Sequence, residues 1–295
     1  MNKVVVVDAL CGQGKTESVI DMMQKDTEGK FLYVTPYLDE CHRVAGTIYD
    51  PLDKDKRPLT DIDGNYIYKE GVRLQSFGFK HPDDSFGKKG KSLCSLLGEG
   101  ENVVSTHALF TELGGNAIEA ARDYTLIIDE SVNVYSQDNR HKTIMDAKEK
   151  KIIYLDTDGI TLRFDRSQFG TPTLENPDTA KGSLYESIAA QCDLGQLLQL
   201  RKKTVIWEMS ADLLRTFKKV IICTYMFEGS EMSVYLKKKG IDYTIQKLTG
   251  AKTARDVSHL IEVLDDDRLN TIGTTGKLSS SAFSSVSKKD FLCET

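Results

Sequence analysis

The amino-terminal segment constrains the fold of this chain more than any other part of it. Residues 3–7 read Lys-Val-Val-Val-Val, an unbroken β-branched run. Such a run is typical of a strand that is buried on both faces of a parallel sheet. It leads directly into a glycine-rich stretch over residues 8–16, and residues 17–25 then carry apolar side chains at helical spacing. The sequence therefore predicts a strand, a loop and a helix in immediate succession.

The residue types of this loop suit a polyphosphate. Gly14, Lys15 and Thr16 complete the pattern G-x-x-x-x-G-K-[ST], with Ala9 in place of the first glycine. Glycines let backbone N–H groups approach phosphate oxygens, and the helix N-terminus adds its dipole. The lysine would neutralise phosphate charge, and the threonine hydroxyl would bind Mg²⁺. A chance Gly-Lys-Thr at an ordinary strand-to-helix turn is the alternative. The predicted nucleotide-binding residues are Ala9, Gly12, Gln13, Gly14, Lys15 and Thr16.

A second apolar run ends in two acids that complement the loop. Residues 124–128 form this run, and Asp129 and Glu130 follow it. An aspartate at the end of a neighbouring strand can reach Mg²⁺ near the phosphates. A glutamate beside it can polarise an attacking water as a general base. The sequence thus predicts Lys15, Asp129 and Glu130 as catalytic residues, with Thr16 and Asp129 on the metal; a strand that ends in solvated acids is the alternative.

These two segments resemble the first two nucleotide motifs of superfamily-two, DEAD-like helicases. Residues 106–110 and 224–230 look most like those of the bacteriophage members, and the resemblance covers roughly residues 3 to 245. It implies an α/β fold of the P-loop NTPase (RecA-like) type, with a mostly parallel central sheet flanked by helices. It also implies ATP as the substrate and Mg²⁺ as the cofactor. The partner that it implies is DNA or RNA, expected to be single-stranded.

Two further segments are similar to the family's strand-binding motifs. Thr35 and Pro36 follow one apolar run, and Ser105, Thr106 and His107 follow another. In an open α/β sheet the loops after the strands form the ligand crevice, where hydroxyls can take phosphate oxygens. The resemblance implies nucleic-acid contacts for all five residues.

Aromatic residues beside these segments have two interpretations. Tyr37 and Phe110 are able to stack on bases. Their position at the start of predicted helices favours a place in the core.

A third segment, Ser210-Ala211-Asp212, is similar to the family's Ser-Ala-Thr motif, with Asp212 in place of the threonine. That motif couples hydrolysis to motion, and the resemblance implies this coupling role here.

The long separation of Asp129 from Ser210 predicts an insertion over about residues 133–200, because strand–helix connections are normally short. Within it, residues 152–162 form two β-like runs about a Thr-Asp-Gly turn, which predicts a hairpin. Residues 184–200 carry apolar side chains at helical spacing, which predicts a helix. The sequence leaves open whether the insertion is a pin or lid over the strand path or a decoration.

The domain organisation departs from the family's pair of motor domains. Nothing in the chain matches the Gln-x-x-Gly-Arg-x-x-Arg-like motif that donates an arginine finger. We expect one RecA-like ATPase domain over residues 1–248. Residues 249–295 are then the stub of a second domain or a flexible Ser-rich tail. A partner could supply the second motor domain, and the sequence does not decide whether the chain is naturally short.

Composition excludes several other classes of protein. There is no apolar run of about 18 residues, which argues against a membrane span. The amino terminus lacks the apolar region of a signal peptide, and the scattered cysteines suit reduced cytosolic thiols. We therefore expect a cytoplasmic protein, in the host cell if phage-encoded. The chain has 39 basic and 44 acidic side chains, a net charge of −5, which argues against a basic coat for nucleic acid.

Three functions remain open from the sequence. The first is an ATP-hydrolysing motor domain of a DNA or RNA helicase or translocase. The second is a P-loop kinase or another phosphotransferase, and the third is a catalytically weak nucleic-acid-binding regulatory fragment. The missing arginine finger favours the third, since such a group is worth about 10³–10⁵ in rate. Direction of movement, base preference and oligomeric state are beyond the sequence.

Overall fold

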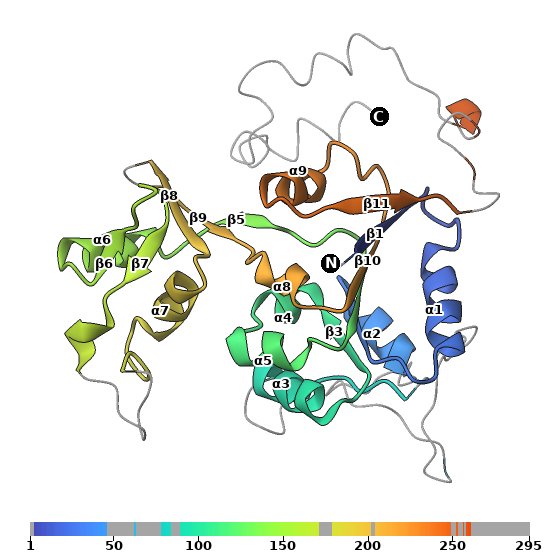
Figure 1. Cartoon of the computed structure of the whole chain (residues 1–295), viewed down its shortest axis with the longest axis horizontal. Coiled ribbons are helices and arrows are strands. Elements are labelled where there is room, and N and C mark those ends of the chain that lie inside the picture. Colours follow the sequence, from blue (N-terminus) through green and yellow to red (C-terminus); the bar gives the residue numbers. More distant parts are fainter. Residues whose placement is uncertain are drawn as a thin grey trace, which may run out of the picture. The chain divides into compact units, whose positions relative to one another are not determined.

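A six-stranded parallel sheet forms the centre of the computed structural model (Figure 1). The strands lie in the order β11-β1-β10-β4-β2-β3. The described residues are 3–45, 62, 78–83, 89–170, 179–201, 204–248, 252, 256 and 258–260. The bounds of the strands in this sheet are β1 Lys3–Asp8, β2 Phe31–Thr35, β3 Val103–Thr106, β4 Thr125–Asp129, β10 Lys219–Thr224 and β11 Tyr243–Gln246. The prediction of an α/β fold with a mostly parallel central sheet is confirmed.

The register of the sheet aligns the carboxyl ends of β1, β10 and β4. Val7 of β1 pairs with Cys223 of β10, and Cys223 pairs with Asp129 of β4. The predicted phosphate loop and the predicted acids therefore leave the sheet at the same edge. β10 lies between their two strands, so the acids are not on the strand next to β1.

Helices cover both faces of this sheet. Successive strand residues point to opposite faces, so Ile127 packs with α1 and α2 whereas Leu126 and Ile128 pack with the helices of the other face. This double burial explains why the strands are continuous apolar runs. The helices of this part of the chain are α1 Lys15–Lys25, α2 Leu38–Ala45, α3 Lys89–Glu99, α4 His107–Thr111, α5 Gly115–Ala120, α8 Asp212–Arg215 and α9 Glu231–Lys238.

The predicted insertion has its own sheets and its own apolar core. A three-stranded sheet has the order β5-β9-β8, and β6 and β7 form the predicted antiparallel hairpin, which is confirmed. A separate cluster of buried side chains joins these strands to two helices. The insertion extends past the predicted end at residue 200, because β9 pairs with β5. Its elements are β5 Tyr135–Gln137, α6 His141–Glu149, β6 Ile153–Leu155, β7 Leu162–Phe164, the 3₁₀-helix η1 Arg166–Phe169, α7 Glu186–Asp193, β8 Leu197–Arg201 and β9 Thr204–Glu208.

The helix predicted over residues 184–200 is wrong in its second half. Helix α7 ends at Asp193, and Gly195 adopts a left-handed backbone with φ of +64°. Such a residue commonly follows a helix and stops it. Leu197 and Leu198 then pair with β9 as part of β8. Their apolar side chains fit the helical spacing by coincidence, and pairing with β9 decides the strand.

The chain divides into two units, residues 1–251 and 252–295. Of the second unit only residues 252, 256 and 258–260 are described, the last three as the 3₁₀-helix η2 Ser258–Leu260. The predicted stub or Ser-rich tail over residues 249–295 lies almost wholly outside the described residues. Every helix in the described part of the chain is too short or too polar to cross a bilayer.

A buried carboxylate fastens the root of the insertion to the sheet domain. Glu208, at the end of β9, is 2% exposed. Its Oε2 accepts a hydrogen bond of 2.8 Å from Lys238 Nζ at the end of α9, and its Oε1 accepts one from Nζ of Lys239, the C-cap of that helix. Burial alone would raise the pKa of Glu208, but the two lysines outweigh it and hold that pKa below its ordinary value.

We predict that Glu208→Gln lowers the free energy of unfolding by about 1–3 kcal/mol at neutral pH, because a buried charge-assisted pair is lost. The folded-state pKa is depressed, so this stabilisation is present above the ordinary carboxyl pKa of about 4.3 and is lost as the pH falls through the folded value. Urea unfolding at pH 7 and near pH 3 measures it, and the difference between wild type and variant should shrink at the lower pH.

Glu228→Gln is the matched control, since Glu228 pairs with Lys237 of the same helix but is exposed. It should cost no more than about 1 kcal/mol. Equal losses in the two variants would contradict the role of Glu208.

Candidate active site

The loop between β1 and α1 presents a helix N-terminus with unused donors. Gly12 and Gly14 have φ of +75° and +78°, where any side chain would strain the backbone. Gly14 caps α1 without a side-chain hydrogen bond. Among the hydrogen bonds of the described residues, none is donated by the backbone N–H of Gly14, Lys15 or Thr16. These groups and the helix dipole favour an anion at this point.

Lys15 folds back over the loop it belongs to. Its Nζ donates to Ala9 O at 2.7 Å and to Leu10 O at 3.2 Å, and the residue is only 6% exposed. A buried ammonium held by two carbonyls is positioned at the centre of the loop, where a phosphate oxygen would compete for its protons.

Thr16 and Asp129 meet although they are 113 positions apart in the sequence. The Thr16 Oγ1 donates to the Asp129 carboxylate at 3.1 Å from Oδ2 and 3.2 Å from Oδ1. Tyr33 of β2 donates a 2.6 Å hydrogen bond to the same Oδ2. Burial, and then the charge of Asp129, raises the pKa of Tyr33, so its phenol stays protonated as a donor. Tyr33 has no signal of its own in the sequence, because its hydroxyl is hidden within an otherwise apolar run.

These oxygens fit the requirements of Mg²⁺. The Thr16 hydroxyl and the Asp129 carboxylate are hard oxygen ligands that converge on one point. Among the residues that the structure describes, no group of three or more His, Cys, Asp or Glu side chains could hold a metal. A site with two protein ligands suits Mg²⁺, which takes its remaining ligands from water and substrate phosphates.

Glu130 has an unusual backbone. Its φ is +63°, a left-handed conformation that a side-chain-bearing residue rarely adopts. Its N–H donates to Cys223 O of β10 at 2.8 Å, which holds the strained residue at the edge of the sheet. Strain of this kind concentrates at functional sites, because the surrounding structure must maintain it.

A cavity of about 350 Å³ brings five of the predicted site residues together: Thr16, Thr35, Pro36, Asp129 and Glu130. Four carboxylates line it, and one guanidinium, that of Arg43 on α2, lies among them. Its described lining is Thr16, Glu17, Thr35, Pro36, Tyr37, Glu40, Arg43, Asp129 and Glu130. Glu40 and Arg43 have no signal of their own in the sequence, because they stand on an ordinary charged helix face.

A larger hollow of about 1060 Å³ adjoins this cavity and shares Pro36, Tyr37 and Glu130 with it. It runs from Cys11 of the phosphate loop to Trp207 at the root of the insertion. Tyr37 is 68% exposed at its rim, so the expectation that this residue lies in the core is wrong. Phe110, by contrast, is fully buried against Phe217, and its place in the core is confirmed.

The residues expected to touch nucleic acid divide into two groups. Thr35 and Pro36 line the smaller cavity. Ser105 lies in β3 with no exposed surface, and its contact with nucleic acid stays a prediction. The Thr106 hydroxyl accepts a hydrogen bond from Leu109 N and caps α4.

His107 is also engaged in a hydrogen bond within the protein. Its Nε2 lies 3.0 Å from Asp129 O, and because a carbonyl only accepts, Nε2 is the protonated nitrogen. Burial lowers the pKa of His107, which keeps the ring neutral. The single N–H of the neutral ring is therefore used by the backbone of β4. To donate to a phosphate oxygen, His107 would have to give up this bond or take a second proton. Its contact with a strand stays a prediction.

Ser210, Ala211 and Asp212 lie at the start of α8 rather than at the end of a parallel strand. The Ser210 Oγ accepts from Asp212 N at 3.3 Å. None of the hydrogen bonds of the described residues joins these three to the phosphate loop, Asp129 or Glu130. Their coupling role stays a prediction.

The position between β1 and β4 belongs to β10, which ends at Thr224. The Thr224 Oγ1 accepts from Ser131 Oγ at 3.0 Å, directly beside Glu130. Asp8, at the end of β1, accepts from Met226 N and Phe227 N at 3.0 and 3.1 Å. The polar end of β10 is thus fastened to the ends of both neighbouring strands, a connection that the sequence did not indicate.

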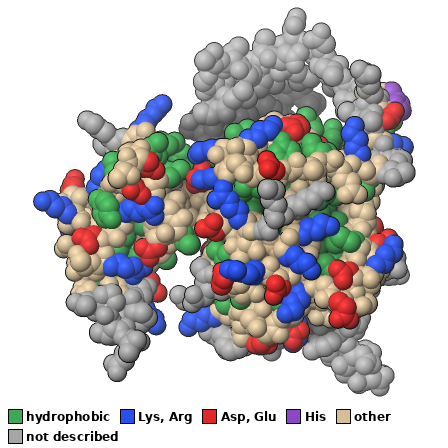
Figure 2. Space-filling view, in the orientation of Figure 1, with side chains coloured by type: hydrophobic (Ala, Val, Ile, Leu, Met, Phe, Trp, Pro, Cys, Tyr) green, Lys and Arg blue, Asp and Glu red, His purple; other side chains and the backbone are tan. Residues whose placement is uncertain are grey.

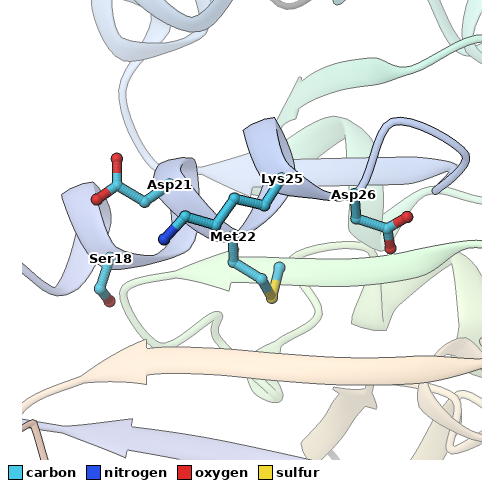
Figure 3. A pocket seen from close by; sticks show the side chains of 5 residues that line it. All are labelled: Ser18, Asp21, Met22, Lys25 and Asp26. Carbon is cyan, nitrogen blue, oxygen red and sulfur yellow. The ribbon is translucent and has the colours of Figure 1, made fainter.

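A third hollow, of about 540 Å³, lies along the outer side of α1 and is separate from this site. Figure 3 shows the side chains that line it, among them Asp21 and Lys25. None of the predicted site residues lines it, although Ser18 on its rim donates to Lys15 O.

Comparison with known proteins finds a distant relative. The chain is 25% identical over 248 residues to the SPbeta prophage-derived uncharacterized protein YonV of Bacillus subtilis (strain 168). The match covers 83% of this chain and 54% of YonV, so the chain spans about half the length of that relative. No family model and no solved structure matches the chain. The similarity is consistent with a phage origin and identifies no helicase family.

The strain at Glu130 has a measurable consequence. We predict that Glu130→Gly has a free energy of unfolding about 1 kcal/mol higher than Glu130→Ala, because only glycine adopts a positive φ without a steric penalty. Chemical denaturation of the two variants measures the difference. At Ser131, whose φ is not positive, the order of the Gly and Ala variants should be reversed. The same order at both positions would contradict the strained backbone.

Proposed function

We propose that this chain is a Mg²⁺-dependent nucleoside triphosphatase, with ATP as its substrate, and the motor domain of a DEAD-like DNA or RNA helicase or translocase. The observation that carries the proposal is the contact of Thr16 Oγ1 with the Asp129 carboxylate. It joins a glycine-rich helix N-terminus to an acid pair at the carboxyl edge of a parallel sheet, where α/β proteins bind ligands. The resemblance to DEAD-like helicases supports the same assignment.

The phosphates would be held by the loop. Backbone N–H groups from Gly12 to Thr16 would donate to the phosphate oxygens, and Lys15 would exchange its two carbonyl partners for β- and γ-phosphate oxygens. Thr16 would bind Mg²⁺ directly and Asp129 would bind it through water. A bound Mg²⁺ polarises the phosphates and neutralises developing charge.

Hydrolysis would use Glu130 as the general base. A water oxygen attacks the γ-phosphorus, and the bond to the β–γ bridging oxygen breaks, with its electron pair leaving on the diphosphate. One water proton passes to the Glu130 carboxylate, which later releases it to solvent. The products are ADP, inorganic phosphate and a proton. Glu130 lines both hollows, which supports this role.

The charge of the larger hollow limits how it would hold nucleic acid. Its described lining has three carboxylates, Glu112, Glu130 and Asp138, and the guanidinium of Arg140 is paired with Asp138. On the face of the molecule drawn in Figure 2, basic and acidic side chains are interspersed. We infer that a strand would be held by aromatic stacking, as on exposed Tyr37, and by backbone groups rather than by a basic surface.

The larger hollow also favours a second candidate, a P-loop phosphotransferase. A small acceptor bound there would stand next to Glu130 and the γ-phosphate, because the two hollows share Glu130, Pro36 and Tyr37. In that case the γ-phosphoryl group would pass to the acceptor in place of water. The two functions are separated by the fate of this group and by the response to nucleic acid.

We predict Mg²⁺-dependent ATP hydrolysis that single-stranded DNA or RNA stimulates and that Lys15→Ala reduces by at least about 100-fold, because the variant loses a charge on the transferred phosphate. Release of inorganic phosphate with and without the strand measures it. Lys25→Ala is the matched control, a lysine on the outer side of the same helix (Figure 3). Equal formation of ADP and phosphate supports hydrolysis. Transfer to a small acceptor without any response to nucleic acid would favour the phosphotransferase instead.

A second prediction separates the base from the metal site. Glu130→Gln keeps the size and hydrogen bonding of the side chain but cannot take a proton. It should bind ATP with nearly wild-type affinity while turnover falls by about 10²–10⁴-fold. Equilibrium binding of ATP and single-turnover hydrolysis test the two parts separately. Wild-type turnover in this variant would remove Glu130 from the mechanism.

A further inference from the structure

Arg43 is the one guanidinium or ammonium group in the described lining of the 350 Å³ cavity. It stands near the carboxyl end of α2, and the same cavity is lined by Thr16, Asp129 and Glu130. Lys15 lies outside this lining and would reach the γ-phosphate from the phosphate loop, where Ala9 O and Leu10 O hold its Nζ. Arg43 is therefore the single cationic side chain of the described lining, which also contains the acid pair.

Two carboxylates hold Arg43 at the cavity wall. Its Nε donates to Glu40 Oε2 at 2.8 Å, and its Nη2 bonds the other oxygen of Glu40, so this pair is bidentate. Its Nη1 lies 4.0 Å from Glu17 Oε1, and Glu17 directly follows Thr16 on α1. The Arg43 side chain is 19% exposed. The bond to Glu40 raises the pKa of Arg43, so the group stays charged throughout the physiological range.

The charges of the cavity require a cation on the γ-phosphate. Glu17, Glu40, Asp129 and Glu130 surround the point that this phosphate would reach. A triphosphate adds its own negative charge, which the four carboxylates repel. Mg²⁺ on Thr16 and Asp129 would compensate for part of this charge, on one side only. The planar fork of an arginine suits the remaining phosphate oxygens, since it donates two parallel hydrogen bonds.

We propose that Arg43 leaves Glu40 to bind the γ-phosphate, and that it stabilises the negative charge of the transition state from within the same chain. This inference rests on the proposed triphosphatase. The reaction is unchanged: water attacks the γ-phosphorus, the bond to the bridging oxygen breaks, its electron pair leaves with the diphosphate and the proton passes to Glu130. Arg43 donates hydrogen bonds to the γ-phosphate oxygens and takes no proton.

A purely structural Arg43 would make different predictions. In that case Arg43 only stabilises α2 through its pair with Glu40 and its proximity to Glu17 of α1, and removal of either Arg43 or Glu40 should have the same effect. In the proposal the two partners act in opposite directions, because Glu40 competes with the phosphate for Arg43. The pair of variants Arg43→Ala and Glu40→Gln therefore separates the two interpretations.

The test compares the affinities of ADP and of a non-hydrolysable ATP analogue, together with the turnover of ATP, in the full chain. Arg43→Ala should lower the affinity for the analogue by about 10- to 100-fold and change the affinity for ADP by no more than about 2-fold, since only the analogue has a γ-phosphate. Turnover should fall by about 10³-fold or more. Arg43→Lys should restore little of either, because an ammonium lacks the bidentate fork.

Glu40→Gln should instead raise the affinity for the analogue relative to that for ADP by up to about 5-fold, because the phosphate no longer competes with a partly exposed ion pair. Arg122→Ala is the matched control: Arg122 makes the same i,i+3 pair with Glu119 outside the cavity. That variant should not change the ratio of the two affinities.

An unchanged ratio of the two affinities in Arg43→Ala would overturn the proposal, and so would an equal loss of analogue binding in Arg43→Ala and Glu40→Gln. Either result leaves the proposed function intact if wild-type hydrolysis still depends on Lys15. If wild type binds the analogue through Arg43 but does not hydrolyse ATP, the triphosphatase fails while the contact of Arg43 with the γ-phosphate stands.

Discussion

The parallel register of β1, β10 and β4 is the constraint on which the candidate site depends. Because Val7, Cys223 and Asp129 lie in one line across the sheet, the loop after β1 and the acids after β4 emerge at the same level. Only then can the Thr16 hydroxyl reach the Asp129 carboxylate, 113 positions away. A shift of one residue in the pairing would turn every side chain of the strand to the opposite face and would move Asp129 away from Thr16.

The same edge of the sheet stores and restrains strain. Glu130 and Met226 both have a positive φ. The Glu130 N–H donates to Cys223 O of β10, and the Met226 N–H donates to the carboxylate of Asp8, the last residue of β1. Two further hydrogen bonds hold Asp129. The Tyr33 hydroxyl on β2 donates to its carboxylate, and the His107 ring, at the start of α4 after β3, donates to its backbone carbonyl. A left-handed residue costs about 1–2 kcal/mol, and these hydrogen bonds offset that cost. Rigid strands thus position the acids, while the loops between them carry the ligand groups.

The features predictable from the sequence are those with a local signature. The strand at residues 3–7, the Gly-Lys-Thr loop and the apolar run before Asp129 each carry a pattern that neighbouring residues determine. Tyr33 and Arg43 could not be found in this way, since a hydroxyl in an apolar run and a charge on a helix face become significant only when another element lies opposite. Leu197 and Leu198 were misassigned for the same reason: their strand exists only because β9 pairs with it.

The electrostatics of the cavity link these observations to the question of a second motor domain. Four carboxylates around one guanidinium repel a triphosphate unless cations accompany it, so a metal and Arg43 address the same deficit of positive charge. The two are not equivalent, because Mg²⁺ would be held by Thr16 and Asp129, whereas Arg43 would approach from α2. If α2 supplies the arginine, a partner that brings a second motor domain would contribute strand binding and movement rather than an arginine on the γ-phosphate. Hydrolysis and motion would then be separable properties, and the first would belong to the sheet domain alone.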